Sequence, residues 1–391
     1  MNTNLAKVKF LEINIRDPDI LWLGNKYFFL TDDIIDLLYN NKGDIFAIIE
    51  YKNKKIPLRK SPLKIIEHFS KTRKNFLYNE KMPFSAMLPF SYQKVDYRIR
   101  WFIASLLARM NYLKFKIRPV FPDWPLDLSA DCIEDLDRFL NHSDRVKNKG
   151  VKTPVILTHD IDNPESLKKL NDFLNIEEKF DIPSTIFIVP KGWKLEDIIL
   201  DEALAKGNEL GVHGYNHDNK TPFLKDDLIR KRMEEILPFI KRYNIKGYRS
   251  PSLLRTENLF RILKEYFIYD SSIPNSGTML SLQSNGCASA RSFIINEGFK
   301  EVPITLPSDA SLLFLGYSPS EILKMWIELS ELISESGGIV VLLTHCEKRY
   351  SGNSAMLNIY EKYLTYLKNF EKYRFFTIYD YIDKYLNNQI F

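Results

Sequence analysis

From residue 151 onward, short apolar runs typical of strands alternate with longer segments whose apolar residues recur at helical spacing. The predicted strands are 154–159, 184–189, 209–213, 247–250, 267–271, 301–305, 339–345 and 374–378. The predicted helices are 164–180, 195–206, 224–243, 256–266, 319–336, 356–370 and 379–386. Strands that alternate with helices build βαβ units, and about seven such units favour a barrel over an open sheet. The sequence therefore predicts an α/β fold, a distorted barrel of the (β/α)7 type.

A polar run at 141–150 separates this alternation from a mixed upstream region. We therefore predict two domains, an N-terminal accessory region over 1–150 and the barrel over 151–391. In the accessory region, an acidic helix start at 31–33 and apolar spacing over 97–110 and 129–140 indicate helices within a mixed α/β arrangement.

The accessory region is also basic. Residues 1–150 hold 26 Lys and Arg against 18 Asp and Glu, whereas residues 151–391 hold 29 against 32. Such a region is either a solvated basic face or a contact for an anionic partner, namely a nucleotide-sugar pyrophosphate or a membrane surface carrying a lipid-linked glycan. No nucleic-acid-binding motif accompanies the charge, so a nucleic-acid partner is not expected.

Composition and the N-terminal sequence predict a compartment. Three scattered cysteines, Cys132, Cys287 and Cys346, form no C-x-x-C pair, which favours a reducing environment or core packing over a disulfide framework. The N-terminus is polar, and no apolar stretch reaches the length of a membrane span. We therefore expect a cytoplasmic protein without a membrane span. Glycine-rich phosphate-binding motifs are absent from the sequence.

Three short motifs follow predicted strands and carry most of the chemically active side chains. They are T-H-D-I-D at 158–162, H-G-Y-N-H at 213–217 and L-T-H at 343–345. In α/β barrels, residues at the C-terminal ends of the strands meet at one end of the barrel. One carboxylate and two imidazoles suit a catalytic divalent metal ion, and a second carboxylate and a third histidine remain for acid–base work. The motifs together predict a metal-dependent hydrolase.

Asp160 and Asp162 are two residues apart, so on a strand both carboxylates lie on one face. Two close carboxylates repel each other unless a cation holds one, which favours a metal ion at Asp162 and a free base at Asp160. A turn with Asx hydrogen bonds is the alternative interpretation of this motif.

His213 and His217 are two of only six histidines and lie four residues apart at a strand end. Gly214 follows the first one, where an H-E-x-x-H metalloprotease requires glutamate, and Asn216 disfavours a helix. We therefore predict a pair of metal ligands on a loop, with Asp162 as the third ligand, rather than a structural pair.

His345 ends the most apolar strand of the second half, which directs it to the active-site end of a barrel unless it is a core or capping histidine. Arg249 and Asp270 close two shorter predicted strands. Both would be costly to bury without a partner, and the expected partners are Asp160 for Arg249 and His345 for Asp270.

The order of these motifs resembles the polysaccharide deacetylase family, the NodB homology domain of carbohydrate esterases. Asp-x-Asp, H-x-x-x-H, R-x-P, Y-D-S-S and L-T-H follow one another within about residues 152–386. Members adopt a distorted (β/α) barrel and remove N- or O-acetyl groups from sugars with a bound divalent metal ion, often zinc. The first motif of the family is more often T-F-D-D, so His159 and Ile161 are typical of an Asp-x-Asp subgroup. Gly214 replaces the usual Ser or Thr, and the fourth motif lacks its tryptophan.

The resemblance implies that Asp162, His213 and His217 hold one divalent metal ion. Zinc is the expected metal, with cobalt, nickel and manganese as alternatives.

The resemblance also implies catalytic roles. Asp160 would be the general base, with Arg249 orienting it, and the backbone N–H of Ser252 would help to hold the oxyanion. His345 would be the general acid, with its pKa tuned by Asp270.

The expected function is removal of an N-acetyl or related acyl group from an amino sugar. A nucleotide- or lipid-linked intermediate of surface polysaccharide biosynthesis is the expected substrate, because no export signal is present and the accessory region is basic, which would also allow peripheral contact with a membrane. Two alternatives stay open: a C–N hydrolase that acts on a small non-sugar amide, and a catalytically silent carbohydrate-binding protein. Aromatic residues that either line a sugar site or belong to the core are Trp193, Tyr215, Tyr248 and Trp326.

Overall fold

The computed structural model describes a large part of the chain. The described residues are 6–13, 26–28, 45–51, 54–59, 77–79, 81–117, 122–131, 134, 152–277, 285–296 and 298–386. Most of the predicted helix at 129–140, the acidic start at 31–33 and Cys132 lie outside these ranges.

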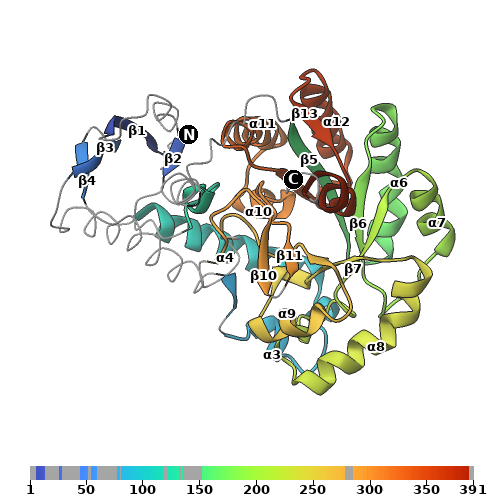
Figure 1. The fold of residues 1–391 in the computed structure, drawn as a ribbon. Helices are drawn as coiled ribbons and strands as arrows, with labels where there is room; N and C mark the ends of the chain where they lie inside the picture. The colour runs from blue at the N-terminus through green and yellow to red at the C-terminus, as the bar shows by residue number, and fades with distance from the viewer. Residues whose placement is uncertain are drawn as a thin grey trace.

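A nine-stranded sheet organises the chain after residue 152 (Figure 1). Its order is β10-β11-β9-β8-β7-β6-β5-β12, with β13 also beside β5, and all pairs are parallel except β10 with β11. The strands are β5 (Thr153–Ile161), β6 (Ser184–Ile188), β7 (Glu209–His213), β8 (Gly247–Arg249), β9 (Tyr269–Asp270), β10 (Phe293–Asn296), β11 (Phe299–Glu301), β12 (Val340–His345) and β13 (Tyr373–Phe375).

The sheet curls so that the segment after β11 reaches β12. Ile304 bridges Pro274, and the Thr305 N–H donates to the Val341 carbonyl at 3.2 Å. The predicted strand at 301–305 is therefore displaced, because Pro303 has no N–H to donate to a ladder and β11 ends before it. The prediction of a distorted α/β barrel is confirmed.

Helices cover the outside of the sheet: in Figure 1, α6 and α7 lie beside β6, and α6 contacts β5 while α7 contacts β7. Their bounds are α6 (Pro164–Lys179), α7 (Asp197–Ala205), α8 (Asp226–Arg242), α9 (Glu257–Leu263), α10 (Asp309–Leu315), α11 (Pro319–Glu335), α12 (Ser354–Lys368) and α13 (Ile378–Asp380), followed by the turn η5 (Tyr381–Leu386). Local sequence explains the starts: the Asn163 side chain accepts N–H bonds at the start of α6, and Ser318 with Glu321 forms a capping box at α11. The short helix α10 was not predicted.

Alternate side chains of strand β5 point to opposite faces of the sheet, one toward the outer helices and the other toward the interior of the barrel. All its residues are buried, as expected for a central parallel strand covered on both faces. Leu157 packs with the outer helices, whereas Ile156 joins an inner cluster with Phe187 and Val341. Because side chains alternate, Thr158 and Asp160 share the inner face with Ile156, and Asp160 stands near the C-terminal end of the strand.

The described part of the accessory region includes two blocks of secondary structure, besides residues 77–79, 122–131 and 134. One is an antiparallel sheet of order β2-β1-β3-β4, formed by β1 (Ala6–Ile13), β2 (Lys26–Phe28), β3 (Ile45–Tyr51) and β4 (Lys54–Arg59). The other contains α3 (Phe84–Met87), the turn η2 (Tyr92–Lys94) and α4 (Tyr97–Ile117), which extends beyond the predicted end at 110.

Helix α4 packs against α10 of the barrel, with the Trp101 and Phe314 rings 4.8 Å apart. Ala108 and Phe115 belong to the same hydrophobic cluster as the barrel helices. The predicted domain boundary at residue 150 stays a prediction. Within the described residues, no helix combines the length and the apolar character needed to cross a membrane.

Candidate metal and catalytic site

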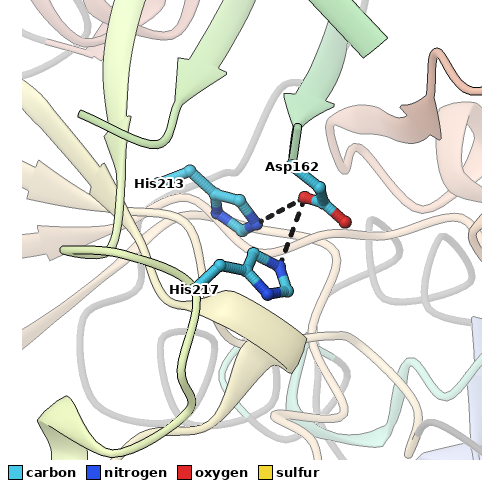
Figure 2. Close-up of side chains that lie close together, drawn as sticks. All are labelled: Asp162, His213 and His217. Carbon is cyan, nitrogen blue, oxygen red and sulfur yellow. Dashed lines mark ion pairs between the residues drawn. The ribbon is translucent and has the colours of Figure 1, made fainter. Parts of the chain in front are cut away.

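Three predicted metal ligands meet at the C-terminal end of the sheet (Figure 2). Asp162 follows β5, His213 ends β7, and His217 lies on the next loop. The Nε2 atoms of His213 and His217 lie 3.2 and 3.3 Å from the same atom, Asp162 Oδ1. One potential ligand atom from each residue lies within 4.8 Å of the others. In the described part of the chain, Asp162 Oδ1 is buried and has no hydrogen-bond partner, and two imidazoles with one carboxylate are a donor set that suits a catalytic divalent metal ion.

The contacts behind the rings decide which ring nitrogen faces this point. His213 Nδ1 lies 3.1 Å from the Arg249 carbonyl oxygen, which only accepts, so Nδ1 carries the hydrogen and Nε2 offers its lone pair. His217 Nδ1 lies 2.9 Å from the Tyr92 phenol oxygen. Tyr92 belongs to η2 in the accessory region and was not predicted as a site residue.

Electrostatics within the cluster favour the ionised carboxylate. Burial raises the pKa of Asp162, but His217 and His213 outweigh it and hold that pKa well below its ordinary value. Burial lowers the pKa of His217, but Asp162 outweighs it and the pKa rises. The carboxylate is therefore available as an anionic ligand at neutral pH.

The loop between the two histidines requires glycine at its start. Gly214 has a φ of +67°, and a Cβ there would lie 2.4 Å from Cδ of Pro251. Serine or threonine at this position would clash with the proline ring, so the backbone as it is folded here requires glycine.

Asp160 has the predicted partner. Its Oδ1 accepts a hydrogen bond of 2.9 Å from Arg249 Nη1, and its Oδ2 lies 3.6 Å from His213 Nε2. Arg249 is fully buried and also donates to Thr158 Oγ1 and to the carbonyl and side-chain oxygens of Ser271. The guanidinium is thus fixed in place, and it holds one carboxylate oxygen while the other faces the metal ligands.

His345 has a different partner from the predicted one. Its Nδ1 lies 2.7 Å from Oδ1 of Asp309, and its backbone N–H donates to Asp309 Oδ2 at 2.8 Å. The Ser351 hydroxyl donates to the same Oδ2 at 2.6 Å. Burial lowers the pKa of His345, but Asp309 outweighs it and raises the pKa to about 10. This shift favours the protonated form of His345 at neutral pH.

The prediction that Asp270 tunes His345 is wrong, and the register of the sheet gives the reason. Asp270 on β9 is paired with Glu301 on β11, whereas His345 on β12 is paired with Asp160 on β5. Burial raises the pKa of Asp270 to about 6, and the Glu301 pKa rises well above its ordinary value. Asp270 also accepts from the Ser272 N–H and hydroxyl, so it supports a neighbouring loop instead.

That loop carries Ser252. The Ser272 hydroxyl accepts from the Ser250 N–H at 2.8 Å, and Ser252 and Leu253 then adopt left-handed φ values of 52° and 56°. Such values are strained for residues other than glycine and cluster at functional sites. The proposed role of the Ser252 N–H stays a prediction.

Sequence reasoning missed a second acid beside the cluster. Glu347 is fully buried, its Oε1 accepts from Asn163 Nδ2 at 2.7 Å, and its Oε2 has no hydrogen-bond partner among the described residues. Burial, followed by the charge of Asp162, raises the pKa of Glu347. Glu347 lies two residues beyond His345 at a strand end, and this position could have identified it as a candidate site residue.

The aromatic candidates divide into two groups. Tyr248 and Trp326 are fully buried core residues, and the Trp326 indole N–H donates to the Pro307 carbonyl, so neither lines an open sugar site. Trp193 and Tyr215 are half-buried on the segments that follow β6 and β7.

Comparison with known proteins agrees with this architecture. Residues 147–268 match the family model described as polysaccharide deacetylase. No curated protein sequence matches the chain. A solved structure described as a probable polysaccharide deacetylase from Pseudomonas aeruginosa PAO1 is 14% identical and covers 62% of this chain and 93% of its own, with a TM-score of 0.50.

A Mycobacterium smegmatis structure described under the same family is 17% identical, covering 63% of this chain and 94% of its own with a TM-score of 0.49. An allantoinase structure is 16% identical, covering 60% and 90% with a TM-score of 0.49. The resemblance predicted from the motifs is thus confirmed, and the chain is similar to the polysaccharide deacetylase family through the family model over 147–268 and through its barrel fold.

Proposed function

We propose that this protein is a metal-dependent hydrolase that removes an N-acetyl group from an amino sugar. The observation that carries the proposal is the convergence of Asp162, His213 and His217 beside two groups suited to acid–base work, Asp160 and His345. The match to the polysaccharide deacetylase family model supports the reaction type.

Asp162, His213 and His217 would hold the metal ion, for which zinc is the expected identity. When bound, the ion would polarise the acyl carbonyl and make a bound water more acidic. Each histidine can offer Nε2 to the ion. Nδ1 of His213 donates to the Arg249 carbonyl and Nδ1 of His217 contacts the Tyr92 phenol, so each ring is held in a ligand orientation.

Asp160 would act as the general base. Arg249 occupies its Oδ1, so Oδ2 is the oxygen that would accept a proton from the attacking water. Because the guanidinium is itself held by Thr158 and Ser271, the orientation of the carboxylate is set before the substrate arrives.

His345 would act as the general acid. Asp309 accepts from Nδ1, which leaves a hydrogen on Nε2 of the protonated ring for transfer to the leaving nitrogen. The Ser252 backbone N–H would donate to the developing oxyanion. No covalent intermediate is required.

The substrate is proposed to be a nucleotide- or lipid-linked amino sugar used in the synthesis of a surface polysaccharide in the cytoplasm. The basic character of residues 52–118, with 17 Lys and Arg against three acidic residues, supports an anionic carrier or peripheral membrane contact.

The test is elemental analysis of the purified protein beside the His213→Ala/His217→Ala variant, followed by assays of acetate release. About one metal ion per chain, lost in the variant, with acetate released from UDP-N-acetylhexosamines or N-acetylated oligosaccharides, is expected. Release only from small non-sugar amides would replace the sugar with another substrate class. No metal uptake after addition of Zn²⁺ or Co²⁺ would overturn the hydrolase mechanism and favour a silent binding protein.

A further inference from the structure

A segment that lies outside the residues matched by the family model contacts the loop that carries His217. The segment 84–94 comprises α3 and η2, whereas the family model matches 147–268. Two side chains of this segment contact the loop that carries His217.

The first contact is made by Tyr92. Its phenol oxygen lies 2.9 Å from His217 Nδ1, and the two ring centroids are 5.9 Å apart. A histidine that offers Nε2 to a metal ion keeps its hydrogen on Nδ1, so this hydrogen needs an acceptor. The Tyr92 oxygen supplies the acceptor, since a phenol oxygen accepts as well as donates. Tyr92 also has a side-chain contact with Ser252.

The second contact is made by Ser85. Its hydroxyl oxygen accepts from Asn219 Nδ2 at 3.1 Å, and the same Nδ2 lies 3.1 Å from Ser252 Oγ. The segment is therefore attached to the histidine loop at two points, and both points are linked to Ser252.

The backbone of the attached loops needs such support. His217, Asn219 and Ser252 have φ values of 57°, 64° and 52° in the left-handed region. Each such residue costs free energy and persists only where surrounding contacts fix it. Tyr92 and Ser85 provide contacts of this kind.

We propose that Tyr92 is a positioning residue for the metal ligand His217, and that the segment 84–94 thereby holds the loop 213–219 in its metal-binding conformation. This inference rests on the proposed metal site. It gives the accessory region a direct part in metal binding, beyond the charge that the sequence indicated.

The experiment compares Tyr92→Phe with Tyr97→Phe in the full chain. Tyr97 is a matched control because it is 48% exposed and its hydroxyl oxygen accepts only an exposed bond from Arg98 among the described contacts. Affinity for Zn²⁺ is measured by competition with a chromophoric chelator, and Co²⁺ loading is followed by its visible absorption spectrum. Loss of a partner behind a ligating histidine weakens metal binding by about 10- to 100-fold.

We expect that loss and an altered Co²⁺ spectrum in Tyr92→Phe, with wild-type values in Tyr97→Phe. Ser85→Ala removes only the second attachment and is expected to weaken Zn²⁺ binding by about 2- to 10-fold, the effect of one neutral hydrogen bond. It keeps the test decisive if Tyr92→Phe does not fold.

Wild-type affinity and spectrum in a folded Tyr92→Phe would overturn the positioning role alone. If Tyr92→Phe is unfolded, wild-type Zn²⁺ affinity in Ser85→Ala would also overturn the positioning role. A wild-type protein that binds neither Zn²⁺ nor Co²⁺ would overturn the proposed function together with this inference.

Discussion

The proposed metal side and the proposed acid side of the site are built in different ways. On the metal side, Asp162 and His213 stand at strand ends, but His217 lies on a loop with left-handed backbone, held by a tyrosine from far upstream. On the acid side, His345 ends a strand, and Asp309 at the start of α10 binds both its ring and its backbone N–H. The metal side therefore depends on a distant segment, and the acid side depends on one helix start.

The largest effect is expected from loss of the metal ligands. In His213→Ala/His217→Ala, only one ligand of the three remains, so metal content should fall from about one ion per chain to none. Elemental analysis with circular dichroism of the same sample checks this result. A variant that keeps stoichiometric metal would show that other residues form the site.

Asp160→Asn separates chemistry from metal binding. It removes the base but keeps the three ligands, so kcat should fall by about 10²- to 10⁴-fold while metal content stays at the wild-type level. Steady-state acetate release and elemental analysis provide the two readouts. Unchanged acetate release in this variant would show that another group acts as the general base.

Gly214→Ala tests the strained metal side. The new Cβ would meet the Pro251 ring at a backbone angle that disfavours alanine, so unfolding free energy should fall by about 1–3 kcal/mol. Metal affinity should fall with it, because the histidine loop must shift. Chemical denaturation of the metal-free protein measures the first quantity, and Gly207→Ala is a useful comparison because nothing lies within 4 Å of a Cβ at that position.

Asp309→Asn tests the acid side. Asp309 raises the pKa of His345 to about 10, so its removal should move the alkaline limb of the kcat/KM profile to lower pH. The same pair should stabilise the folded state fully below the ordinary histidine pKa of about 6.5, and this contribution should disappear as pH rises toward about 10. An alkaline limb that stays in place would exclude His345 as the acid.

The smallest effect on the alkaline limb of the kcat/KM profile is expected from Asp270→Asn. Asp270 contacts Ser272 and Glu301 and does not appear among the partners of His345, so the limb should stay at its wild-type pH. A shift as large as that of Asp309→Asn would restore the role that the sequence suggested for Asp270.

Much of the barrel could be predicted because its central strands are long and apolar. The predicted strand at 209–213 coincides with β7, and the strand at 339–345 differs from β12 by one residue. The convergence of Asp162, His213 and His217 followed from these strands, since carboxylates and histidines placed after parallel strands converge.

The contacts that were missed depend on tertiary structure. Asp309 lies on a seven-residue helix without a long apolar pattern, and its pairing with His345 follows from the curl of the sheet. Tyr92 is one of 21 tyrosines, and no spacing relates it to a histidine 125 residues away. The role expected of Asp270 came from its place at a strand end and from the family resemblance, and neither carries information about the register between β9 and β11.

The packing of α4 on α10 has a practical consequence for shortening this chain. Helix α10 carries Asp309, while the Trp101 ring of α4 lies 5.5 Å from Tyr350, which in turn lies 5.0 Å from His345. A chain cut at residue 150 would keep every motif residue. It would lose Trp101, which packs on Tyr350 beside His345, and Tyr92, which contacts His217. For expression or transplantation, the smallest unit worth making starts upstream of Leu77, not at the first strand of the barrel.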